Sequence, residues 1–106
     1  MQLSNDDIGR TLYMVEPVRV DEKQFNVIYF GTLISIIPKY QFLDAFSSEY
    51  KRSQNYIFKV AGPFNQYLTK TTTSPDMVFE KIEGALNTSG VNSLFHYSVL
   101  FTNNKE

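Results

Sequence analysis

The sequence predicts an α+β fold: a small, mostly antiparallel β-barrel or strongly bent sheet, with one helix packed on it at about residues 75–87 and a final β-strand. Nine Phe and seven Tyr fall largely in runs of alternating apolar and polar positions, the pattern of half-buried strands. One later segment combines the start signal, apolar spacing and stop signal of a helix. Because 106 residues is a usual size for one domain, we expect a single domain over 1–106, with 1–8 and 103–106 flexible.

Two long strands are predicted in the first third of the chain. The first runs from Thr11 to Val20, and Pro17 should lie at an edge, bulge or bend because proline has no N–H for ladder pairing. The second runs from Phe25 to Ile37 and is apolar on both faces. Gly31 in its middle predicts a bulge or a sharp bend.

Residues 39–54 fit two secondary structures. Three aromatic residues recur there at four-residue spacing, which favours a helical turn or short helix over an irregular strand: Phe42, Phe46 and Tyr50. The alternation over 56–60 then predicts a strand, and Gly62-Pro63 predicts a turn into a partner strand over 64–71.

The predicted helix begins at Ser74-Pro75-Asp76, which places a capping side chain, a first-turn proline and an acid in the order a helix start prefers. One side of it is apolar and should pack on the sheet: Val78, Phe79, Ile82, Ala85 and Leu86. Gly90 provides the stop signal. A final strand is predicted over 94–102.

Four short motifs carry a family resemblance: Ile8-Gly9-Arg10-Thr11-Leu12-Tyr13-Met14-Val15, Gly31-Thr32-Leu33-Ile34-Ser35-Ile36, Tyr67-Leu68-Thr69 and Ala85-Leu86. Over residues 8–87 the chain resembles short phage and bacterial proteins with an SH3-like small β-barrel. The resemblance implies a barrel but no activity. The long segment between Ile37 and Tyr56 and the strand after the helix depart from that pattern, so a ferredoxin-like or other α+β sandwich stays open.

The sequence offers no constellation typical of catalysis. His96 is the only histidine, lies in the predicted last strand and has no cysteine or catalytic motif to work with. The five glycines are too widely spaced for a phosphate-binding loop. We therefore predict a protein that is not an enzyme, with no catalytic residue, no cofactor and no metal.

Charge and composition limit the choice of partner. Ten basic residues against eleven acidic ones do not favour duplex nucleic acid. No apolar run approaches the roughly 20 residues of a membrane span, so we expect no membrane and a cytoplasmic location, the host cytoplasm for a viral protein. Phe, Tyr, Asn, Lys, Ile and Met together greatly outnumber Ala, Gly, Pro and Arg, as in the AT-rich genomes of many phages and some bacteria.

The leading functional hypothesis is a small non-enzymatic protein-binding module, a phage-type accessory protein that binds and modulates a host or viral protein. Self-association into a homo-oligomer is compatible with this hypothesis. The expected contact residues lie in the 39–56 segment: Tyr40, Tyr50, Arg52 and Tyr56. One alternative is a barrel that stacks single-stranded nucleic acid on Tyr13, Tyr29, Tyr40, Tyr56 and Tyr67. A virion structural or connector protein is the other.

Overall fold

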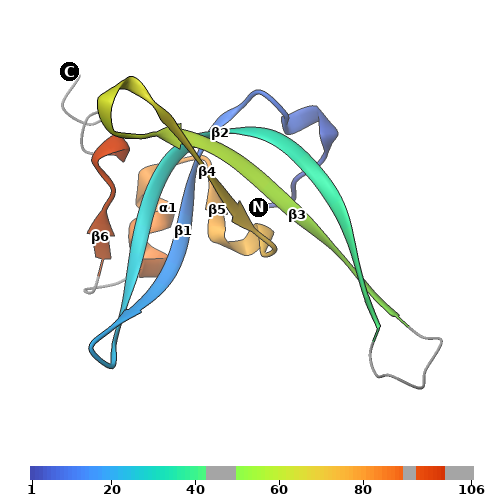
Figure 1. The fold of residues 1–106 in the computed structure, drawn as a ribbon, viewed down its shortest axis with the longest axis horizontal. Helices are drawn as coiled ribbons and strands as arrows, with labels where there is room; N and C mark the ends of the chain where they lie inside the picture. Colours follow the sequence, from blue (N-terminus) through green and yellow to red (C-terminus); the bar gives the residue numbers. More distant parts are fainter. Residues whose placement is uncertain (43–49, 90–92, 100–106) are drawn as a thin grey trace.

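The computed structural model describes residues 1–42, 50–89 and 93–99. They form one six-stranded sheet, mostly antiparallel, and a short α-helix, which confirms the α+β class (Figure 1). The elements are β1 Thr11–Val20, β2 Lys23–Phe42, β3 Tyr50–Ala61, β4 Tyr67–Thr72, β5 Val78–Phe79, β6 Ser93–Phe95 and α1 Ile82–Ser89, with 3-10 turns η1 Asn5–Asp7, η2 Pro63–Asn65 and η3 Pro75–Met77.

The strand order is β4-β3-β2-β1-β5, and β6 pairs with β2 beside this path. Within the described ranges the two end strands, β4 and β5, do not pair with each other, so the sheet is open. It is a strongly bent sheet, and a closed barrel is not confirmed.

The long strand β2 organises the sheet. Its residues 23–32 pair with β1 along one edge, and residues 31–42 pair with β3 along the other. Residues 26–28 pair in parallel with β6 on the same edge as β3. The predicted irregularity lies at Ile34, where the pairing shifts between Leu33 and Ser35, and not at Gly31. Gly31 instead allows close approach, because a Cβ there would lie 2.5 Å from Val60 Cγ1.

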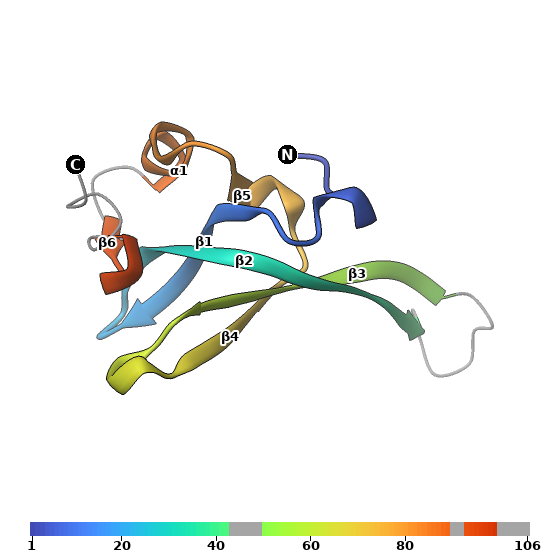
Figure 2. The ribbon, with the colours of Figure 1, turned by 90° about the horizontal axis from the view of Figure 1, so that it is seen from above.

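Apolar side chains pack on both faces of the bent sheet. The concave face, over which β4 curls, carries Leu12, Met14, Tyr29, Leu33, Tyr56, Phe58, Val60 and Val78. The convex face carries Tyr13, Val15, Ile28, Ala85 and Val99, with Phe30, Met77, Phe79 and Ile82 packed against them. Figure 2 shows α1 on one side of β1 and β2, and β4 on the other. Successive side chains of a strand point to opposite faces of the sheet. A strand that is apolar on both faces, as was predicted for β2, therefore contributes to both the concave and the convex cluster.

The prediction of a helix within 39–54 is wrong for the part that the structure describes. Residues 39–42 continue β2 and residues 50–54 begin β3, in a register that pairs Phe42 with Tyr50. Residues 43–49, including Phe46, lie outside the described residues. In the described part of the hairpin, hydrogen bonds between the two strands satisfy the backbone N–H and C=O groups that intrahelical bonds would satisfy in a helix. Aromatic residues spaced by four are therefore compatible with strands as well as with a helix.

The predicted helix starts seven residues too early. Ser74-Pro75-Asp76 leads into the single 3-10 turn η3, and the Ser74 side chain makes no capping bond. Val78 and Phe79 then pair with Met14 and Tyr13 of β1 as β5, so the helix begins only at Ile82. The helix also leaves Leu86 exposed, whereas Ala85 is fully buried. Pairing with β1 outweighs a local start signal that is weak on its own.

The last two predicted strands are shorter than expected. The chain turns through η2 before β4 begins at Tyr67, because Phe64 and Asn65 have left-handed backbone angles that no strand accommodates. The final strand covers only 93–95, and residues 97–99 are helical. Residues 100–102 lie outside the described residues.

The start of the chain, expected to be flexible, contains the capped turn η1. The Ser4 side chain accepts a hydrogen bond from the Asp6 N–H, and the Asp7 carboxylate accepts one from the Ser4 N–H. Arg10 bridges Asp7 and Glu80 through bonds of 2.9 and 2.7 Å. These contacts attach η1 to the region after β5.

Candidate functional site

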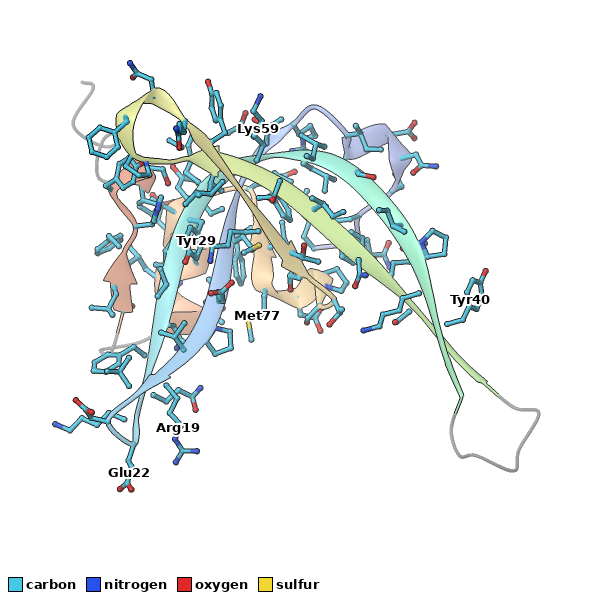
Figure 3. All side chains as sticks on the ribbon, viewed as in Figure 1. Arg19, Glu22, Tyr29, Tyr40, Lys59 and Met77 are labelled. Carbon is cyan, nitrogen blue, oxygen red and sulfur yellow. The ribbon has the colours of Figure 1, made fainter. Side chains whose placement is uncertain are left out.

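The segment expected to bind a partner lies mostly in a β-hairpin that leaves the body of the molecule. We call residues 34–42 of β2 and 50–55 of β3 the arm (Figure 1). Tyr40 lies on it, 58% exposed, and points away from the body in Figure 3. The backbones of Tyr50 and Arg52 belong to β3, but their side chains lie outside the described part of the structure. Tyr56 is only 6% exposed and belongs to the concave cluster, so most of its side chain packs inside the fold.

The arm is a two-stranded ribbon with open edges. Among the described strands, β1 pairs with β2 only as far as Thr32, and β4 pairs with β3 only from Tyr56 onward. Ile37 is 46% exposed on this ribbon. The arm also makes the molecule elongated. The radius of gyration of the molecule is 15.4 Å, whereas a compact domain of this length has a radius of gyration of about 13 Å. A two-stranded ribbon with exposed apolar side chains is marginally stable alone.

A second surface lies at the turn between β3 and β4. The Gly62 N–H donates to the Gln66 carbonyl at 2.7 Å, and the Gln66 N–H donates to the Pro63 carbonyl at 3.1 Å. These bonds hold Phe64 and Asn65 at φ angles of 57° and 62°. Glycine or asparagine is usual at such positions, and a bulky residue there costs about 1–2 kcal/mol. Phe64 as a whole is nevertheless 92% exposed.

A pocket of about 370 Å³ opens beside this turn. The described residues that line it are aromatic, amide-bearing or small, and none of these carries a formal charge: Phe30, Ala61, Gly62, Asn65, Gln66, Tyr67, Tyr97 and Ser98. Tyr67 is 64% exposed, and Lys59 Nζ lies 4.1 Å from its ring centroid. We call these lining residues, together with Phe64, the turn patch.

The concave face carries a polar cluster under β4. Lys70 Nζ lies 3.7 Å from Glu16 Oε1 and 5.0 Å from the ring centroid of Tyr29. Burial lowers the pKa of Lys70, but its interactions with Tyr29 and Glu16 outweigh burial, so that pKa is raised. His96 stacks on Tyr29 with ring centroids 4.7 Å apart. Burial, and then the charge of Lys70, lower the pKa of His96.

His96 and Ser98 form a local pair that shapes the chain after β6. The Ser98 N–H donates to His96 Nδ1 at 3.3 Å, and Ser98 Oγ lies 2.9 Å from the same nitrogen. The Phe30 N–H donates to Ser98 Oγ at 3.3 Å. This arrangement suits a neutral imidazole whose Nδ1 accepts hydrogen bonds. Because Ser98 is buried and its Oγ already accepts a hydrogen bond from β2, the pair holds residues 97–99 against the sheet.

Sequence reasoning did not identify the turn patch as a partner surface. Tyr67 entered only as a stacking candidate, while Phe64 and Tyr97 were assigned to strands. Of the five tyrosines considered for stacking, Tyr40 and Tyr67 are exposed, whereas Tyr13, Tyr29 and Tyr56 are buried. The available signal was Phe64 itself, a large aromatic residue two positions after the Gly62 that begins a turn.

Comparisons of the chain with protein-family models, curated proteins and solved structures find no match. The resemblance to SH3-like barrels therefore stays a prediction. In the described ranges, no three His, Asp or Glu residues are grouped so that they could hold a metal ion. None of the helices in residues 1–42, 50–89 and 93–99 is long and apolar enough to cross a membrane.

Proposed function

We propose that this chain is a small non-enzymatic protein-binding module, an accessory protein that binds a host or viral protein through the arm. The observation that carries the proposal is the exposure of Ile37 and Tyr40 on a ribbon whose strand edges have no described partner strand. Such a ribbon gains stability when a third strand or an apolar surface covers it. A bound partner protein would contribute that third strand or apolar surface.

The binding mode that fits the arm is strand addition. An extended segment of the partner pairs with an open edge, main-chain hydrogen bonds supply affinity, and side chains on the two faces supply specificity. Tyrosine suits such a contact, because its large amphipathic ring loses little conformational entropy when it is immobilised. The net charge of −1 leaves apolar and main-chain contacts as the main source of affinity.

Affinity capture from cells that normally contain the protein tests this proposal, with bound proteins identified by mass spectrometry. The double variant Ile37→Ser/Tyr40→Ala should lose the partner and still unfold within a few degrees of the parent, because both side chains are exposed. Val20→Ser is the matched control, since Val20 is exposed at the far hairpin between β1 and β2. Undiminished capture by the double variant would contradict binding through the arm.

A second candidate function is single-stranded nucleic-acid binding at the turn patch. The observation in its favour is Lys59, which lies over the exposed ring of Tyr67 and so places a cation beside a stacking surface. Fluorescence anisotropy with a labelled single-stranded oligonucleotide tests it. Binding that weakens with salt and is lost in Tyr67→Ala would support this function over protein binding.

A further inference from the structure

Phe64 has the properties of an interface residue. The residue is 92% exposed, so its side chain contributes almost no packing to the folded monomer. Its backbone has a φ of 57° and a ψ of 39°, where Asn or Gly would fit with less strain. A strained, exposed aromatic residue without a packing role points to contact with something outside the monomer.

The pocket beside Phe64 has matching properties. Its volume of about 370 Å³ is at the small end of binding pockets, the size for a side chain rather than a large ligand. Three aromatic residues, Phe30, Tyr67 and Tyr97, are among those that line it. An aromatic side chain is the group that such walls accommodate best, through offset or edge-to-face contacts.

Phe64 and the pocket lie next to each other on one surface. Asn65, the residue after Phe64, already lines the pocket. A two-fold axis beside the turn would therefore place each Phe64 over the pocket of the other copy, because a two-fold interface uses the same patch twice. We propose that the protein forms a two-fold dimer in which Phe64 of each copy enters the turn-patch pocket of the other.

Charge and area are consistent with a second copy as the occupant. Phe64 and the described residues that line the pocket carry no formal charge, so the pocket itself presents no like charge to a second copy. Lys59, which lies over the Tyr67 ring, would be at the rim of the interface, where charged side chains stay solvated. Phe64, Tyr67 and Tyr97 are 92%, 64% and 41% exposed. An aromatic side chain has roughly 150–250 Å² of surface to bury. Scaled by these exposed fractions, the three residues together offer about 400 Å² of surface per copy to the interface. Two copies then bury about 800 Å² before the turn backbone and pocket rim are added, close to the low end of specific interfaces at about 1,000–1,200 Å².

Sedimentation-velocity centrifugation of the full chain over a wide concentration range tests the dimer. An interface of this size predicts a dissociation constant roughly in the micromolar range. Phe64→Asn removes the ring and suits the turn, so it should fold and weaken dimerisation at least about thirtyfold, as for other hot-spot aromatic residues. Ala61→Leu should weaken dimerisation as well, because it fills the pocket and leaves Phe64 in place. The arm variant Ile37→Ser/Tyr40→Ala should dimerise like the parent. The two proposals therefore fail separately: loss of the dimer proposal leaves partner binding through the arm intact, and loss of the arm proposal leaves the dimer intact.

Isotope-filtered NMR on a mixed labelled and unlabelled sample provides the direct test. Intermolecular NOEs from the Phe64 ring to Tyr67 and Tyr97 are expected. A chain that stays monomeric at millimolar concentration would overturn the proposal, as would a dimer unaffected by Phe64→Asn. Single-stranded oligonucleotide binding that Phe64→Asn abolishes, in a protein that stays monomeric, would assign the turn patch to nucleic acid instead.

Discussion

Lys70 Nζ on β4 lies 3.7 Å from Glu16 Oε1 on β1, although β3 and β2 separate these two strands in the sheet. Adjacent strands lie about 4.8 Å apart, so strands three places apart in a flat sheet would be about 14 Å from each other. The pair therefore forms only because the sheet bends strongly. It links the two sides of the concave face.

Breaking this pair should destabilise the protein slightly. Both side chains are 29% exposed, and partly exposed pairs contribute about 0.2–1 kcal/mol. Glu16→Gln should therefore lower the free energy of unfolding by less than about 1 kcal/mol in urea titrations, and by less still at high salt. Glu22→Gln, at the exposed β1–β2 hairpin, is the control and should have no effect. A loss above 2 kcal/mol would mean that the pair maintains the bend itself.

Gly31→Ala should destabilise the fold more, by about 1–3 kcal/mol. The added Cβ would lie 2.5 Å from Val60 Cγ1 and 2.9 Å from the Lys59 carbonyl oxygen, so β2 and β3 must separate. The effect should shrink in a Val60→Ala background, where one of the two close neighbours is gone. Equal losses in both backgrounds, measured by urea unfolding, would assign all the strain to the Lys59 carbonyl.

Stability should depend on His96 at mildly acid pH. The pKa of His96 in the fold is lowered by burial and then by Lys70, from an unperturbed value of about 6.5. Between the folded pKa and about 6.5, the unfolded chain binds a proton that the folded chain does not. The free energy of unfolding should therefore fall as the pH drops through this window, and level off below the folded pKa.

The variant His96→Asn isolates that contribution. Asparagine keeps an acceptor for the Ser98 N–H and does not titrate. The difference in unfolding free energy between parent and variant should change with pH only below about 6.5. A constant difference from pH 5 to 8 would show that His96 has the same pKa in both states.

Replacing Phe64 should stabilise the monomer when the new residue fits the turn. Phe64→Asn should raise the free energy of unfolding by about 0.5–1 kcal/mol, because asparagine tolerates a positive φ. Phe64→Ala keeps the strain and loses only an exposed ring, so it should stay within about 0.5 kcal/mol of the parent. Thermal melts at a concentration where the parent is monomeric check both values. Equal stability of the two variants would mean that the turn is not strained.

Local patterns predicted this fold well where the strands carry their own apolar alternation. The first strand has the predicted bounds, 11–20. Prediction failed where a distant partner decides the outcome. Nothing near Val78 and Phe79 in the sequence shows that Met14 and Tyr13 offer them a free strand edge, and that pairing turns the start of a predicted helix into β5.

The candidate surfaces were predictable to different extents for the same reason. Tyr40 was expected at a binding segment, and it is exposed there. Tyr56 in that segment is buried, because its strand alternation directs it to the concave cluster. Phe64 after Gly62 was a local signal for the turn patch, but the pocket beside it was not predictable, since Tyr97, which lies 33 residues after Phe64 in the sequence, contributes to its lining.

The parallel pairing of β6 with β2 has a consequence for biosynthesis. Residues 26–28 of β2 are synthesised long before Ser93–Phe95 of β6, the residues that pair with them in the folded protein. At about 5–20 residues per second, the ribosome needs roughly 3–13 s to add the intervening chain. During that interval an apolar strand edge on the nascent polypeptide is open to wrong partners, so chaperone supply and translation rate should influence how much native protein a cell accumulates.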